Sequence, residues 1–132
     1  MPLLALHAVS KSYGALKVTD NITLSVTKGE TLGILGPNGA GKTTLFNLIS
    51  GDVSVNAGRV EYAGEDVTGL PPHLRCRRGI GRSYQVPQPF GNMSVFENLV
   101  TAACFGAGQP ERQAWETAVR VLEQTGLMAH AN

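Results

Sequence analysis

Residues 36–43 read Gly-Pro-Asn-Gly-Ala-Gly-Lys-Thr and match the phosphate-binding loop pattern G-x-x-x-x-G-K-[ST] at every constrained position. The apolar run at residues 31–35 before the loop predicts a short buried strand. Residues 42–50 after the loop carry apolar side chains at helical spacing, and Gly51 stands where a glycine typically ends a helix. A strand, a glycine loop and a helix in this order favour an α/β fold and make the loop a candidate binding site.

The residue types in this loop suit an anion. Its glycines lack Cβ atoms, so the chain can turn tightly and bring backbone N–H groups close to a phosphate. The helix that opens at Gly41 adds unpaired N–H groups and the positive end of its dipole. Lys42 can reach the β- and γ-phosphates, and the Thr43 hydroxyl can bind Mg²⁺. The candidate nucleotide-binding residues of the loop are Gly36, Pro37, Asn38, Gly39, Ala40, Gly41, Lys42, Thr43 and Thr44.

The alternative is a chance match in a chain that contains 16 glycines. The flanking strand and helix favour a real site over that alternative. A charged contact of this kind is worth roughly 1.5–3 kcal/mol, so losing Lys42 should weaken nucleotide binding by roughly tenfold to a hundredfold.

Composition limits the other functions of the chain. With 132 residues and 42% hydrophobic content, the chain is long enough for one modest domain. Its net charge of +1 gives no overall field that would favour nucleic acid. The two cysteines lie in no metal or redox spacing and indicate free thiols in a reducing cytosol. The N-terminal residues lack the features of a signal peptide, and no uncharged stretch is long enough to span a bilayer.

Alternation of apolar and polar residues predicts most of the strands. The predicted strands are residues 4–9, 22–27, 58–62 and 80–84. In the first strand, alternation places Leu6 and Ala8 on one face. The polar alternating strands come first and the buried elements later, so we expect an antiparallel sheet that leans on a parallel one.

Capping signals predict the helices. Pro71 and Pro72 suit the first turn of a short helix that runs to about Arg78. Ser94 and Glu97 form a capping box at the start of a second helix. A last helix spans roughly residues 111–125 and carries Ala114, Ala118, Val121 and Leu122 on one face.

Taken together, these residues resemble the ATP-binding subunits of ABC transporters, over essentially the whole chain. Residues 10–14 are similar to the segment that places an aromatic ring, here Tyr13, against adenine. Gln85 is similar to the Q-loop glutamine, which touches Mg²⁺ or the attacking water and senses the membrane partner. The resemblance implies a P-loop NTPase fold, with an antiparallel β subdomain packed on an incomplete, mainly parallel core sheet. It also implies ATP and Mg²⁺ as cofactors, catalytic roles for Lys42 and Gln85, and metal binding by Thr43 and Gln85.

Three longer segments narrow the resemblance. Residues 45–51, 64–72 and 78–85 look like ATPase subunits of branched-chain amino acid importers, with the ATPase of lipopolysaccharide export as the nearest competitor. The family's signature motif, the Asp-Glu pair after an apolar strand and the switch histidine are absent. We therefore expect residues 1–132 to be the N-terminal part of one nucleotide-binding domain, which binds ATP and hydrolyses it negligibly by itself.

Each single residue has an ordinary alternative role. Tyr13 could pack on its own strand pair, and Gln85 could be a polar loop residue. The basic cluster invites a nucleic-acid interpretation, but cations at the end of a helix and a balanced total charge argue against it. The cluster consists of His73, Arg75, Arg77, Arg78 and Arg82.

The resemblance also implies partners. The region from Gln85 to Phe96 would contact a transmembrane permease subunit, with Phe90 and Met93 as exposed candidates. A second ATP-binding subunit would complete a dimer, and the protein would lie in the cytoplasm, on the inner face of the cell membrane. The alternatives are a soluble ABC-type ATPase that remodels ribosomes or DNA, and a nonproductive nucleotide-binding module that pairs to cover unpaired strand edges.

Overall fold

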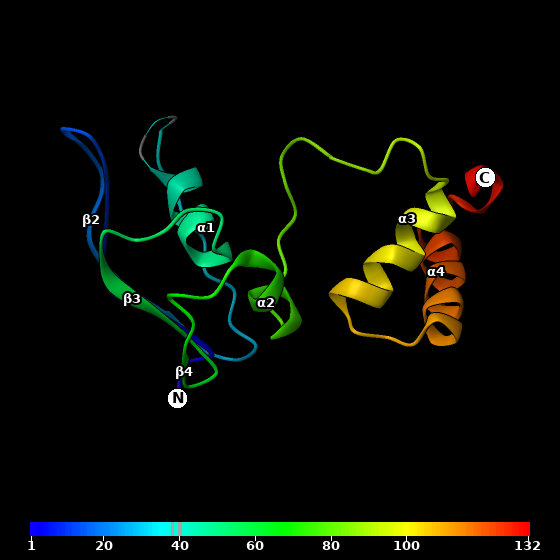
Figure 1. Cartoon of the computed structure of the whole chain (residues 1–132), viewed down its shortest axis with the longest axis horizontal. Coiled ribbons are helices and arrows are strands. Elements are labelled where there is room, and N and C mark those ends of the chain that lie inside the picture. The colour runs from blue at the N-terminus through cyan, green and yellow to red at the C-terminus, as the bar shows by residue number, and fades with distance from the viewer. Residues whose placement is uncertain (38, 40) are drawn as a thin grey trace. The chain divides into compact units, whose positions relative to one another are not determined.

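The structure is a computed structural model that describes residues 1–37, 39 and 41–132. The chain divides into two compact units, Met1–Arg75 and Cys76–Asn132, and each is described by itself. The first unit holds a small sheet and the loop of residues 36–43, and the second is helical (Figure 1).

The sheet of the first unit has four antiparallel strands in the order β2-β1-β3-β4. The strands are β1 (Leu4–Tyr13), β2 (Leu16–Val26), β3 (Ala57–Tyr62) and β4 (Glu65–Asp66). These bounds confirm the predicted strands at residues 4–9, 22–27 and 58–62, and they extend β1 and β2 toward the turn between them.

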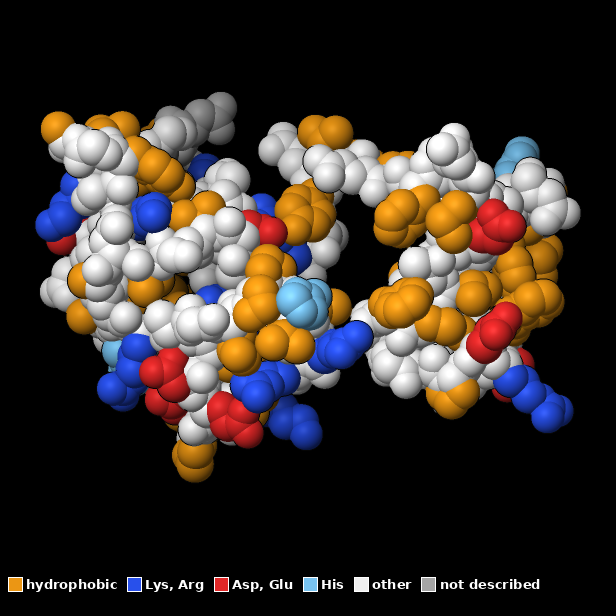
Figure 2. Space-filling view, viewed as in Figure 1, with side chains coloured by type: hydrophobic (Ala, Val, Ile, Leu, Met, Phe, Trp, Pro, Cys, Tyr) orange, Lys and Arg blue, Asp and Glu red, His pale blue; other side chains and the backbone are white. Residues whose placement is uncertain are grey.

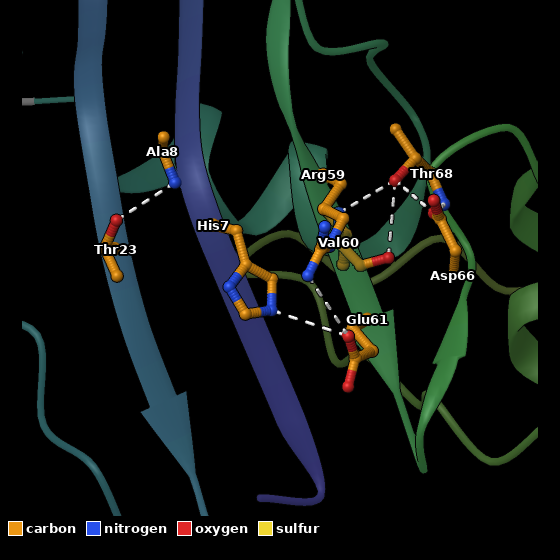
Figure 3. A network of polar contacts seen from close by, with 8 residues as sticks. All are labelled: His7, Ala8, Thr23, Arg59, Val60, Glu61, Asp66 and Thr68. Atoms are coloured by element: carbon orange, nitrogen blue, oxygen red, sulfur yellow. Dashed lines mark hydrogen bonds and ion pairs between the residues drawn. The ribbon is translucent and has the colours of Figure 1, made fainter.

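The alternation predicted for β1 is wrong at Ala8, because a bulge interrupts the strand. The register with both neighbouring strands shifts after Leu6 or His7, and Ala8 has φ 51° and is exposed while Val9 is fully buried. The Ala8 N–H donates to Thr23 Oγ1 at 3.0 Å (Figure 3). Gly58 fits beside the bulge only because it has no Cβ, which would lie 2.4 Å from the Ala8 carbonyl oxygen.

Two helices accompany the sheet (Figure 1). Helix α1 (Lys42–Ser50) begins after Gly41 and ends at Gly51, which has φ 89° and donates its N–H to the Asn47 carbonyl. It buries Leu45 and Leu48 in the core of the first unit, together with strand residues such as Leu6, Val9 and Val60. The second helix is α2 (Pro72–Arg77), as the two prolines predict.

Two predicted strands are wrong. Residues 31–35 and 80–84 have no strand structure, and every strand pair in residues 1–37, 39 and 41–132 is antiparallel. The side chain of Leu35 is 96% exposed, although the sequence predicts a buried strand there. A parallel strand needs a neighbour brought alongside by a crossover, and the described residues pair no neighbour with either segment. The mainly parallel core sheet of the predicted fold is therefore not formed by these residues.

The second unit is a helix pair. Helix α3 (Val95–Thr101) continues as the π-helix η1 (Ala102–Gly106), and α4 (Glu111–Thr125) packs against them before the short 3₁₀-helix η2 (Met128–His130). The predicted capping box is confirmed, since Ser94 Oγ accepts from the Glu97 N–H and the Glu97 carboxylate accepts from the Ser94 N–H. The rings of Phe96 and Trp115 meet edge to face, with centroids 5.2 Å apart. No helix in the described ranges is long and apolar enough to cross a membrane.

Candidate functional site

A cavity of about 300 Å³ opens at the start of α1. Its walls come from the glycine loop, the first turn of α1 and one strand; they are Val18, Gly39, Gly41, Lys42, Thr43 and Thr44. Gly41 has φ 88°, and the first backbone bond of the helix runs from the Leu45 N–H to the Gly41 carbonyl. Within the described chain no side chain caps this end. Because the first N–H groups of a helix have no partner within it and the helix dipole is positive at this end, the start of α1 can bind an anion.

Val18 of β2 also lines the cavity. Lys11 pairs with Thr19 and Ser12 pairs with Lys17, so Val18 is an extra residue on β2 with no cross-strand partner of its own. A Cβ on Gly41 would lie 2.7 Å from the Val18 carbonyl oxygen. Glycine at position 41 is therefore required twice, by its positive φ and by the close approach of β2.

Lys42 donates from Nζ to the carbonyl oxygen of Gly36, at the start of the same loop. The ammonium is thus held next to the cavity by an acceptor that a phosphate oxygen can replace. Asn38 and Ala40, the two remaining loop residues of the predicted site, lie outside the described residues.

Tyr13 lies at the end of β1, opposite Leu16 of β2. Leu16 is two residues before Val18, so about 7 Å of extended strand separates the Tyr13 pairing from the wall of the cavity. The Tyr13 side chain is 49% exposed, and the Lys11 ammonium lies over its ring, 5.3 Å from the centroid. The hairpin thus presents an aromatic ring to solvent near the cavity at the start of α1.

Gln85 belongs to the second unit, where it is exposed at a bend. Three residues before Gln85, the Arg82 guanidinium lies over the Tyr84 ring, 4.4 Å from the centroid. Lys42 and Thr43 belong to the other unit, and each unit is described by itself. The catalytic and metal-binding roles of Gln85 stay predictions.

The residues after Gln85 present apolar side chains to solvent. Phe90 is 58% exposed, and Met93 and Val95 are exposed as well. Met93, Phe96 and Val100 of this unit line a shallow cavity of about 190 Å³ together with Trp115 of α4. Hydrophobic side chains also gather on the visible surface of α3 and α4 (Figure 2). The exposure of Phe90 and Met93 is as the sequence predicts, and a partner contact at these residues stays a prediction.

The glycine loop and the helix end could bind phosphates, and the exposed ring could stack on a base. Comparison with known proteins identifies the family. The family model described as ABC transporter matches residues 19–132. This chain belongs to the ABC transporter family.

The relatives of this chain include several ATP-binding proteins. The chain is 41% identical over 102 residues to the probable branched-chain amino acid transport ATP-binding protein LivG of Archaeoglobus fulgidus, which covers 77% of the chain and 40% of LivG. It is also 41% identical over 100 residues to the lipopolysaccharide export system ATP-binding protein LptB of Escherichia coli, which covers 76% of the chain and 42% of LptB. The chain thus spans about half the length or less of the curated relatives it matches.

A solved structure supports the fold. An ATP-binding cassette of an ABC transporter, crystallised in its ADP conformation, has a TM-score of 0.82 and 33% identity to this chain. The match covers 100% of this chain and 57% of that one. The described residues therefore have the fold of part of an ABC cassette, even though their only sheet is antiparallel.

The cavity fits Mg²⁺ as well as phosphate. Mg²⁺ is usually held by one or two protein oxygens, with phosphate oxygens and water as the other ligands. Thr43 is exposed on the cavity wall and supplies one such oxygen. When bound, the ion would neutralise charge on the phosphates.

One residue of the site was missed by sequence reasoning. Val18 lies in β2, far from the loop pattern along the chain, and nothing in its own neighbourhood marks it. Its place in the cavity appears only in the structure, where a Cβ on Gly41 would lie 2.7 Å from the Val18 carbonyl oxygen.

Proposed function

We propose that this chain supplies the nucleotide-binding part of an ATP-binding subunit that energises an ABC importer. ATP would bind with its phosphates in the cavity at the start of α1 and its adenine against Tyr13. The observation that supports the proposal is the cavity itself, which is lined by Lys42 and the first turn of α1, at a helix end that no described side chain caps. Asn38 and Ala40 belong to the same loop, and we include them in the proposed site.

The importer would transport branched-chain amino acids. LivG of Archaeoglobus fulgidus and BraF of Pseudomonas aeruginosa, the latter 33% identical over 145 residues, both carry that transport in their names. The LptB proteins are similar at the same level, so lipopolysaccharide export is the second candidate. Co-purification from a cell membrane would distinguish these candidates by the permease that is recovered, and recovery of ribosomes would support a soluble ATPase instead.

The partners follow from the same proposal. A transmembrane permease would contact the region from Gln85 to Phe96, where Phe90 and Met93 are exposed. A second ATP-binding subunit would complete the hydrolytic site, and the protein would be cytoplasmic and peripheral to the inner face of the membrane. The 132 residues contain no Leu-Ser-Gly-Gly-Gln sequence and no Asp-Glu pair after an apolar strand. We therefore expect the chain as given to bind ATP and to hydrolyse it negligibly.

Nucleotide titration tests the proposal. ATP binding would be measured by calorimetry with and without Mg²⁺, on the 132-residue wild-type chain and on its Lys42→Ala variant. We expect the substitution to weaken binding by about tenfold to a hundredfold, since it removes a charged contact. Lys28→Ala is the matched control, because Lys28 is an exposed lysine in the turn after β2. Equal ATP affinity of the wild type and Lys42→Ala would contradict the proposed phosphate site.

A further inference from the structure

Lys11 contacts the face of the Tyr13 ring, although it does not line the cavity at the start of α1. The two residues are two positions apart on β1, and the ammonium lies 5.3 Å from the ring centroid, within the range of a cation–π interaction. Lys11 itself is half-buried, whereas Tyr13 is exposed. The lysine therefore covers part of a side chain that is 49% exposed to solvent.

The other lysines near the site have different partners. Lys17 forms an ion pair with Asp20, with 2.9 Å between Nζ and Oδ1, and Lys42 donates to the Gly36 carbonyl. Within the described ranges, the ring of Tyr13 is the only partner found for the Lys11 ammonium. Lys11 is also absent from the residues that line the phosphate cavity. Its charge is thus directed at the aromatic ring rather than at the phosphate position.

We propose that Lys11 is a positioning residue for the purine base of the bound nucleotide. The proposal rests on the function proposed above, with ATP bound at the α1 cavity and its base at Tyr13. The ammonium occupies one face of the ring and holds the ring in place, so that the base stacks on the opposite face. A stacking platform that is already oriented loses less side-chain freedom when the base binds.

The experiment compares two ligands, ATP and inorganic tripolyphosphate, both with Mg²⁺. Tripolyphosphate keeps the charge that α1 binds and lacks the base, so it reports the phosphate site alone. The variants are Lys11→Met, which keeps the aliphatic stem without the charge, Lys11→Arg, which keeps the charge, and Tyr13→Ala. Lys17→Met is the control. Lys17 belongs to the same hairpin, but its ammonium is paired with Asp20.

We expect Lys11→Met to weaken ATP binding by about two- to fivefold and to leave tripolyphosphate binding unchanged, since an exposed cation–π contact has that strength. Lys11→Arg should bind ATP as the wild type does. In a Tyr13→Ala background, Lys11→Met should have no further effect, because the ring through which Lys11 acts is gone.

Three results would overturn the inference. Equal weakening of ATP and tripolyphosphate would mean that Lys11 attracts the phosphates directly. An effect that persists without Tyr13 would mean that the ring is not involved. Unchanged ATP affinity in Lys11→Met, even with reduced stability, would leave only a structural contact. Failure of the proposed function itself would look different, because ATP would then bind the wild type and Lys42→Ala equally well or not at all.

Discussion

The guanidinium of Arg75 lies where a side chain on Gly51 would have to be. A Cβ at Gly51 would be 2.8 Å from Nε of Arg75, and Gly51 also has φ 89°, a conformation that other residues rarely adopt. Gly51 ends α1, the helix whose first turn lines the cavity of the proposed site. The pair therefore fixes the C-terminal end of the helix on which the proposed site is built.

Gly51→Ala should destabilise the first unit. The positive φ costs about 1–2 kcal/mol for a residue with a Cβ, and displacing Arg75 from its acceptors adds about 1–2 kcal/mol. Gly29→Ala is the matched control, because Gly29 has φ 85° with nothing within 4 Å of the Cβ position. Urea denaturation followed by circular dichroism would measure both variants. Equal losses in the two variants would show that Arg75 imposes no steric requirement on Gly51.

Arg75 should be the most sensitive basic residue in the chain. It is 3% exposed and donates four hydrogen bonds to backbone carbonyls, those of Leu70, Leu48, Ile49 and Thr68. Burial lowers the pKa of its guanidinium, and the nearby Asp52 and Asp66 carboxylates oppose that shift. Two of its acceptors, Leu48 and Ile49, are carbonyls at the end of α1 that otherwise lack helical partners.

Arg75→Met should therefore lower the free energy of unfolding by about 3 kcal/mol or more, because it leaves buried carbonyls without donors. Arg75→Lys should lose less, since an ammonium can still reach some of them. Arg77 lies two residues further along α2 and is exposed. The free energy of unfolding of Arg77→Met should therefore stay within about 0.5 kcal/mol of the wild type. A small loss in Arg75→Met would contradict the structural role assigned to these hydrogen bonds.

The sequence correctly predicted the features that are determined by residues close together along the chain. Glycines at helix ends, the capping box at Ser94 and the prolines before α2 act within a few positions, and each marked its element correctly. Arg75 appeared only as one member of a basic cluster, because two of its acceptors lie 26 and 27 positions away. Residues 31–35 were predicted as a strand from their composition, but a strand also needs a partner that local sequence does not reveal. For the same reason the sequence marked the glycine loop as a candidate site and missed Val18, which lines the same cavity.

Stability in acid should depend on Asp66. The Thr68 hydroxyl and the Thr68 N–H both donate to the Asp66 carboxylate, and the same hydroxyl accepts from the Val60 N–H at 2.8 Å (Figure 3). These hydrogen bonds, first that from the Thr68 side chain, hold the pKa of Asp66 below its ordinary value. The ionised carboxylate is therefore favoured in the folded state.

The lowered pKa of Asp66 decides how stability changes with pH. A carboxylate whose folded pKa is lowered stabilises the fold above the ordinary carboxyl pKa of about 4, and this stabilisation is lost as the pH falls through that value toward the folded pKa. Denaturation curves between pH 7 and pH 3 should show a steeper loss for the wild type than for Asp66→Asn, which cannot ionise. Parallel curves for the two proteins would show that the Thr68 contacts do not favour the charged form.

The Mg²⁺ dependence of nucleotide binding should depend on the Thr43 hydroxyl, which lies on the cavity wall at the first turn of α1. Thr43→Val keeps the shape of the side chain and removes the oxygen, so ATP should bind about tenfold more weakly with Mg²⁺ and unchanged without it. Thr43→Ser restores the oxygen and should bind ATP as the wild type does in both conditions. Titrations of the three proteins with and without Mg²⁺ make this comparison directly. If Thr43→Val weakened binding equally in both conditions, the hydroxyl would act on the phosphates or on the loop itself, and the metal would have no ligand in the first turn of the helix.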